Sequence, residues 1–118
     1  SMGGLVSRAY LRAHGNAKVA KLVTLGSPHH GSRLAVLGLG ENGRQMIPGS
    51  DWLAGLNASG AVPLPETVSI YSCQDNYVMP QDSSLLEGAK VVPLGGLGHL
   101  EMAFSPEVER VLLAELDA

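Results

Sequence analysis

The sequence predicts an α/β domain built on about three parallel strands. Three short apolar runs, at 21–25, 67–72 and 89–94, have the length and the β-branched content of buried strands. Segments in which apolar residues recur at helical spacing precede and follow these runs. Strands that alternate with helical segments are typical of a parallel sheet covered by helices. The 118 residues are enough for one small domain.

The first half of the chain is predicted to contain a helix, a strand and a second, shorter helix. Apolar residues recur at helical spacing over roughly 3–14, and Gly15 provides a stop. The strand at 21–25 follows and runs into a loop rich in glycine, serine and proline. A short helix is expected at 51–57, because Ser50 is a good N-cap.

The second half is predicted to continue the alternation. The strand at 67–72 is followed by a helix of one or two turns at 82–88, for which Asp82 would be the N-cap. The third strand, at 89–94, then leads into a glycine-rich loop.

The last helix has the clearest sequence pattern. Ser105 suits the N-cap and Pro106 suits the first helical position. Acidic residues follow in the first turn, where the helix dipole favours them. The face expected to be buried contains Val108, Val111, Leu112 and Leu116.

The composition excludes several classes of function. The net charge is −3 and the chain has no run of Lys or Arg, which argues against binding to nucleic acid. Its apolar stretches are too short and too interrupted for a transmembrane helix. The single cysteine, Cys73, excludes an internal disulfide and a cysteine-based metal cluster, and its place in the strand pattern predicts a buried, inert thiol.

Chemically distinctive side chains follow the predicted strands. His29 and His30 come after the first strand, Asp75 after the second and His99 after the third. In an open parallel sheet, active sites gather beyond the carboxyl ends of the strands. An aspartate and a histidine on neighbouring strand ends can form a hydrogen bond that fixes the tautomer of the imidazole.

The opening residues, Ser1-Met2-Gly3-Gly4, resemble the second half of the Gly-X-Ser-X-Gly nucleophile elbow of α/β-hydrolase lipases. The order of serine, aspartate and histidine along the chain is also that of this fold. The resemblance is closest to small bacterial triacylglycerol lipases of the Bacillus type and covers nearly the whole chain except 32–64. It continues through Thr24 to Gly31, Ile70 to Asp75 with Val78, and Gly95 to Met102.

The resemblance implies a serine ester hydrolase that acts through an acyl-enzyme and needs no metal or other cofactor. Ser1 would be the nucleophile, His99 the general base and Asp75 the residue that orients His99. The backbone N–H of Met2 would donate to the oxyanion. Gly3 is expected in the tight elbow because a side chain there would clash.

Some of these residues have a second interpretation. His29 and His30 could form a metal-binding pair or a second base, but adjacent histidines after a strand are more often loop residues with local hydrogen bonds. Ser1 could be a residue left by a cloning vector before a start Met2. Alternatively, the chain is a piece of a longer one. The resembled lipases are secreted, but the sequence itself does not fix the compartment.

Residues 32–64 correspond to the place where such lipases have a lid or a wall of the acyl pocket. This segment is rich in apolar residues, which favours either a flap that opens at a lipid surface or an irregular cover over the core. The implied substrate is a lipid or a small carboxylic ester.

The resemblance also implies that the chain is a partial domain, the C-terminal part of an α/β-hydrolase fold beginning at the nucleophile. The strand at 21–25 would then lack its usual neighbour, and an open edge favours association. We therefore expect a homo-oligomer or pairing with an N-terminal half. Two other functions remain open at this stage: a non-catalytic assembly module, and an N-terminal-nucleophile hydrolase that uses the amine of Ser1 as base.

Overall fold

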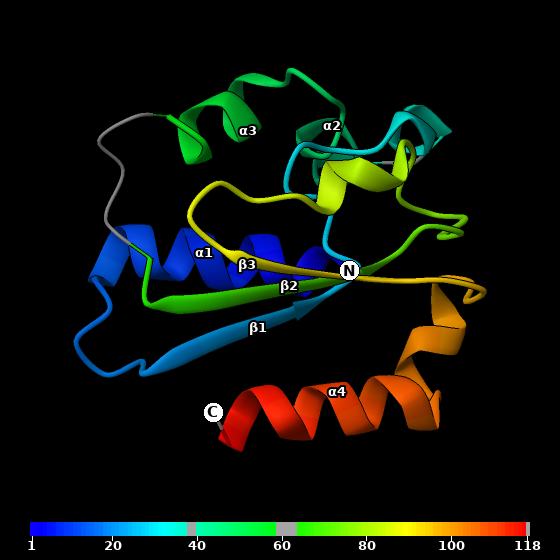
Figure 1. Cartoon of the computed structure of the whole chain (residues 1–118). Coiled ribbons are helices and arrows are strands. Elements are labelled where there is room, and N and C mark those ends of the chain that lie inside the picture. Colours follow the sequence, from blue (N-terminus) through cyan, green and yellow to red (C-terminus); the bar gives the residue numbers. More distant parts are fainter. Residues whose placement is uncertain (38–39, 59–63, 118) are drawn as a thin grey trace.

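The computed structural model of the chain describes residues 1–37, 40–58 and 64–117. It confirms a small α/β domain with three parallel strands and flanking helices (Figure 1). The strands lie in the order β1-β2-β3, and β2 pairs in parallel with both neighbours. Their bounds are β1 Lys21–Leu25, β2 Glu66–Ser72 and β3 Lys90–Leu94.

Helices cover both faces of the sheet (Figure 1). Helix α4 lies on one face, and α1 lies on the other face together with the shorter α2 and α3. The helices span α1 Met2–His14, α2 Gly40–Gln45, α3 Asp51–Leu56 and α4 Pro106–Asp117. The loops of the described part of the chain contain the 3-10 turns η1 Arg33–Leu37, η2 Gln81–Ser84 and η3 Leu100–Ala103.

The middle strand forms the centre of the core. Val68 and Ile70 of β2 are buried together with Val108 of α4. On the other face, Leu5 of α1 packs against Leu53 of α3 in a second cluster. Burial on both faces accounts for the continuous apolar pattern of the strands.

Two helix starts have the caps that the sequence predicts. The Ser50 hydroxyl accepts a hydrogen bond from the Leu53 N–H at 3.2 Å, and Ser105 accepts one from the Val108 N–H at 3.4 Å. Each bond satisfies one of the N–H groups that a helix start leaves without a partner.

Two expectations about the second half are wrong. The helix expected at 82–88 is only a 3-10 turn, Gln81–Ser84, and Asp82 lies inside it instead of capping it. In α4, Leu116 is 54% exposed, whereas Glu115 is buried and forms an ion pair with Lys90 at 2.6 Å. The buried face of α4 therefore ends on Glu115 instead of Leu116.

Candidate functional site

Asp75 and His99 lie beyond the ends of adjacent strands, β2 and β3, and the structure brings them together. Asp75 Oδ2 accepts a hydrogen bond from His99 Nδ1 at 2.8 Å. The contact arises because parallel strands end at the same edge of the sheet, so that the loops that follow them meet.

The carboxylate of Asp75 is held in a fixed orientation. Its Oδ1 accepts hydrogen bonds from the backbone N–H groups of Tyr77 at 2.8 Å and Val78 at 2.9 Å. The Gln81 side chain donates to the backbone carbonyl of Asp75 at 3.0 Å. Since Asp75 is only 1% exposed, the two backbone N–H groups replace water around the buried carboxylate.

The loop that carries His99 is tied to the loop that carries Asp75. The His99 N–H donates to Asn76 Oδ1 at 2.9 Å, and the Ser72 hydroxyl donates to the Leu97 carbonyl at 2.5 Å. The ring of Tyr77 packs against that of His99, with 5.1 Å between centroids. His99 is therefore held in place by contacts of its backbone N–H, its ring and its Nδ1.

This arrangement determines the tautomer of His99. An ionised carboxylate only accepts hydrogen bonds, so Asp75 requires the proton to be on Nδ1. The lone pair of the neutral ring is then on Nε2, which makes no hydrogen bond with any residue that the structure describes. The geometry is that of a histidine prepared to accept a proton at Nε2.

Ser1 lies at the same edge of the sheet, just before α1 (Figure 1). Its amino nitrogen donates to the carbonyl of Leu25, the last residue of β1, at 2.8 Å. Burial lowers the pKa of this amino group, and the nearby Asp75 carboxylate acts in the opposite direction. Among the described residues, the hydroxyl of Ser1 has no hydrogen bond to His99.

Gly26 connects β1 to this group of residues, a role that sequence reasoning missed. It follows Leu25 directly and has a φ of 58°, a conformation that favours glycine. A Cβ at Gly26 would lie 3.0 Å from Asp75 Oδ2 and 3.3 Å from the ring of His99. Its position after a strand was the only signal. The sequence gives no signal for the supporting role of Asn76, because that role depends on the position of the loop after β3, which carries His99.

The expectation that Gly3 is required because a side chain would clash is wrong for this chain. A Cβ at Gly3 meets nothing within 4 Å, whereas one at Gly4 would lie 2.1 Å from Ser27 Oγ and 3.0 Å from Thr24 Cγ2. The close approach is therefore made one residue later, where α1 packs on the end of β1.

His29 is part of a buried hydrogen-bond network. Its Nε2 lies 3.1 Å from Thr24 Oγ1, and its Nδ1 lies 3.3 Å from Nη1 of Arg8. Because a guanidinium only donates, Nδ1 accepts and Nε2–H donates to Thr24. In the described part of the chain, no group of three or more His, Cys, Asp or Glu residues could hold a metal ion.

The network predicts an acid sensitivity of folding. Burial, followed by the charge of Arg8, lowers the pKa of His29 from 6.5 to about 3. Between these pH values His29 is protonated in the unfolded chain but not in the folded chain. The free energy of unfolding should therefore fall as the pH decreases from about 6.5 to 3, by about 1.4 kcal/mol per unit from this group.

Denaturant unfolding at a series of pH values measures this slope. His29→Gln should flatten the pH dependence by about one proton, whereas His14→Gln, which changes an exposed histidine, should leave it unchanged. Equal slopes in the wild type and His29→Gln would contradict the assignment.

The expectation for Cys73 is also wrong. The thiol is exposed, because Cys73 comes directly after the last residue of β2 and lies outside the strand. The sequence pattern typical of a strand continues through Cys73, but β2 ends at Ser72.

The described parts of 32–64 are partly packed into the core. Leu53 and Leu56 of α3 are buried against Leu5, and Met46 and Trp52 pack on the same cluster. The side chains of 36–39 and residues 59–63 lie outside the described part, so the expectation of an apolar flap there remains a prediction. No helix in the described part is long and apolar enough to cross a membrane.

No protein-family model matches the chain, and no curated protein matches it.

Proposed function

We propose that this chain carries the catalytic residues of a serine carboxylic-ester hydrolase of the α/β-hydrolase type. The observation that carries the proposal is the hydrogen bond between buried Asp75 and His99, which leaves Nε2 of His99 without a partner among the described residues. Ser1 at the same edge of the sheet supplies the nucleophile, and the substrate is a lipid or small carboxylic ester.

The proposed reaction has two steps. The Ser1 hydroxyl attacks the ester carbonyl while His99 Nε2 takes its proton, and the tetrahedral oxyanion collapses to an acyl-Ser1. His99 gives the proton to the departing alcohol. Water, deprotonated by His99, then attacks the acyl group. The bond between the acyl carbon and Ser1 Oγ breaks, His99 returns the proton to Oγ, and the carboxylic acid leaves. Asp75 stabilises the imidazolium that forms in each step.

Met2 is proposed to supply an oxyanion donor. It is the first residue of α1, and the first N–H groups of a helix have no partner within it. One oxyanion donor typically contributes a factor of about 10²–10³ to the rate. With Met2 as the donor that this chain supplies, we expect slow hydrolysis.

Hydrolysis of p-nitrophenyl butyrate tests the proposal. We expect slow turnover that Ser1→Ala abolishes, whereas Ser7→Ala, which changes another serine near the start of α1, leaves turnover intact. Equal rates of turnover in Ser1→Ala and the wild-type chain would contradict the assignment of Ser1 as nucleophile.

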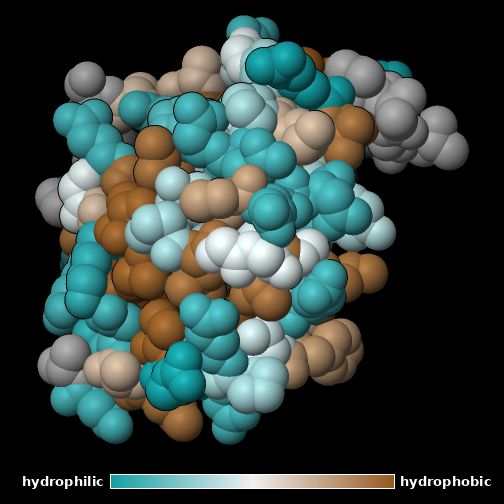
Figure 2. All heavy atoms as spheres, turned by 45° about the vertical axis from the view of Figure 1, so that its right-hand side comes forward, coloured by the Kyte–Doolittle hydropathy of each residue, from teal (hydrophilic) through white to brown (hydrophobic). Residues whose placement is uncertain are grey.

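We also propose that the chain associates through the open edge of β1. Within the described residues, β1 pairs only with β2, so its other edge presents backbone groups without a strand partner. Large apolar side chains are exposed as well, among them Val6 and Tyr10 of α1. Hydrophobic residues also form a patch on the face in Figure 2. The partner is a second copy of the chain or an N-terminal half of the domain.

Light scattering at micromolar concentration measures this association. The expected result is a mass of at least two chains, and Val23→Pro should reduce it, because the N–H of Val23 points to the open edge of β1 and not to β2. Circular dichroism shows whether that variant still folds. A clean monomer of the wild-type chain would contradict the proposal.

A further inference from the structure

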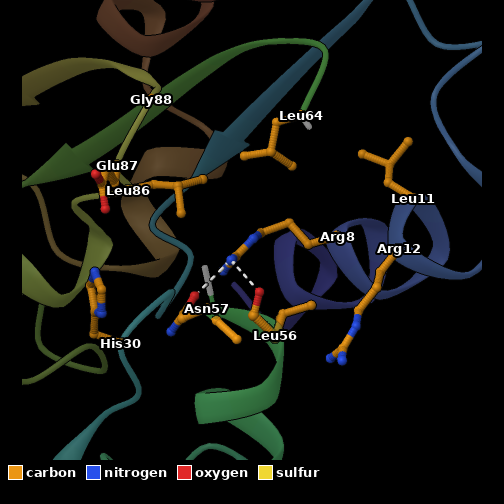
Figure 3. A pocket seen from close by; sticks show the side chains of 11 residues that line it. Arg8, Leu11, Arg12, His30, Leu56, Asn57, Leu64, Leu86, Glu87 and Gly88 are labelled. Atoms are coloured by element: carbon orange, nitrogen blue, oxygen red, sulfur yellow. Dashed lines mark hydrogen bonds between the residues drawn. The ribbon is translucent and has the colours of Figure 1, made fainter. Parts of the chain in front are cut away.

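Arg8 is a buried cation at the centre of a cavity. The residue is 5% exposed, and its guanidinium lies among the side chains that line a cavity of about 510 Å³ (Figure 3). Nη2 donates to Asn57 Oδ1 at 2.6 Å and to the Leu56 carbonyl at 3.3 Å. Nη1 donates to His29, as described above.

These three bonds leave part of the guanidinium unused. An arginine has five N–H donors, and Nε of Arg8 is buried with no hydrogen-bond partner. A buried donor without a partner costs free energy, and the cost is larger for a charged group. Arg8, which lines the cavity, therefore carries a charge that the hydrogen bonds of the protein satisfy only in part.

No carboxylate of this chain compensates the charge. The ion pairs among the described residues do not include Arg8. The residues outside the described part contain no acidic side chain. Glu87 lines the cavity but is exposed, and Arg12 adds a second positive charge to the lining. A buried cation without a counter-ion favours an anionic ligand.

Beside these charged groups and the side chains of His30 and Asn57, the lining has an apolar part. Four leucines from α1, α3 and two loops contribute to it: Leu11, Leu56, Leu64 and Leu86. Figure 3 shows Leu64 and Leu86 on one side of the Arg8 guanidinium, and Leu56 and Asn57 on the other. A ligand that fits this lining has one anionic head and a hydrocarbon tail.

We propose that this cavity binds an aliphatic carboxylate, with its head group on Arg8 and its chain against the leucines. Asn57 and His29 hold the guanidinium in place, and the carboxylate pairs with its uncompensated charge. Such a charge-assisted bond is stronger than one between neutral groups. The site does not include Asp75 or His99, and the inference does not depend on ester hydrolysis.

Calorimetric titration of the wild-type chain with octanoate, octanol and inorganic phosphate tests the ligand class. Octanoate should bind about tenfold more tightly than octanol, because only octanoate satisfies the buried charge. Phosphate should bind more weakly than octanoate, because it has no tail to bury. Equal affinities for octanol and octanoate would overturn the role of Arg8, and tighter binding of phosphate would overturn the aliphatic ligand.

A spectroscopic measurement keeps the proposal testable if Arg8→Met fails to fold. The Nε–H resonance of Arg8 in wild-type NMR spectra should shift on addition of octanoate and not on addition of octanol. If Arg8→Met folds, octanoate affinity should fall about tenfold, whereas Arg110→Met, an exposed arginine of α4, should retain it. An unchanged Arg8 resonance at saturating octanoate would overturn the proposal.

Discussion

Asp75→Asn is expected to reduce the rate of Ser1 acylation by a factor on the order of 10⁴. An amide at this position can donate to Nδ1, which would hold His99 in the tautomer that has its proton on Nε2. That tautomer cannot accept the proton of the Ser1 hydroxyl. Because the amide has nearly the same volume as the carboxylate, the buried site should remain packed.

The rate of reaction with a fluorophosphonate, measured by intact mass, gives this effect directly. Asp82→Asn is the matched control, since Asp82 is exposed and lies on the neighbouring η2. Unchanged kinetics in Asp75→Asn would show that the hydrogen bond to His99 has no part in the reaction.

Gly4→Ala is expected to destabilise the fold by about 2–3 kcal/mol. The added Cβ would lie 2.1 Å from Ser27 Oγ and 2.7 Å from Ser27 Cβ, and Ser27 is buried at the end of β1. Helix α1 must then move away from the sheet or distort the loop after β1. Either movement also displaces Ser1 from Leu25.

Gly3→Ala is the matched control for this effect. A Cβ at Gly3 meets nothing within 4 Å, so the gain in helix propensity should stabilise α1 by up to about 1 kcal/mol. Thermal unfolding of both variants measures the difference. Comparable stability of Gly4→Ala and the wild type would contradict the close packing of α1 on Ser27.

Local patterns were sufficient to predict most of the secondary structure. The strands near 21–25, 67–72 and 89–94 are present within a residue or so of their expected ends. The Ser50 and Ser105 caps depend only on neighbouring residues, and both are formed. Such features are encoded locally, which is why the sequence alone reveals them.

Features that depend on distant contacts could not be predicted in this way. Glu115 is buried because Lys90, on β3, neutralises it, and helical spacing contains no information about that strand. The network of Arg8, His29 and Asn57 joins three segments far apart in the sequence. Local sequence patterns therefore contain no signal for this network, although they single out His29 as a candidate.

The candidate site depends partly on local sequence patterns and partly on contacts between distant segments. Asp75 and His99 could be selected because each follows a strand, and the parallel pairing of β2 and β3 brings their loops together. The positions of Asn76 and Tyr77, which hold His99, required the structure.

The most direct test of the central claim is the site at which a fluorophosphonate reacts with this chain. We expect a single adduct on Ser1, found by peptide mass spectrometry, and its loss in His99→Ala. His30→Ala, which changes an exposed histidine of a neighbouring loop, should still form the adduct. An adduct on a different residue, no adduct at all, or the same rate of labelling in His99→Ala would contradict the assignment of Ser1, His99 and Asp75 as one catalytic unit.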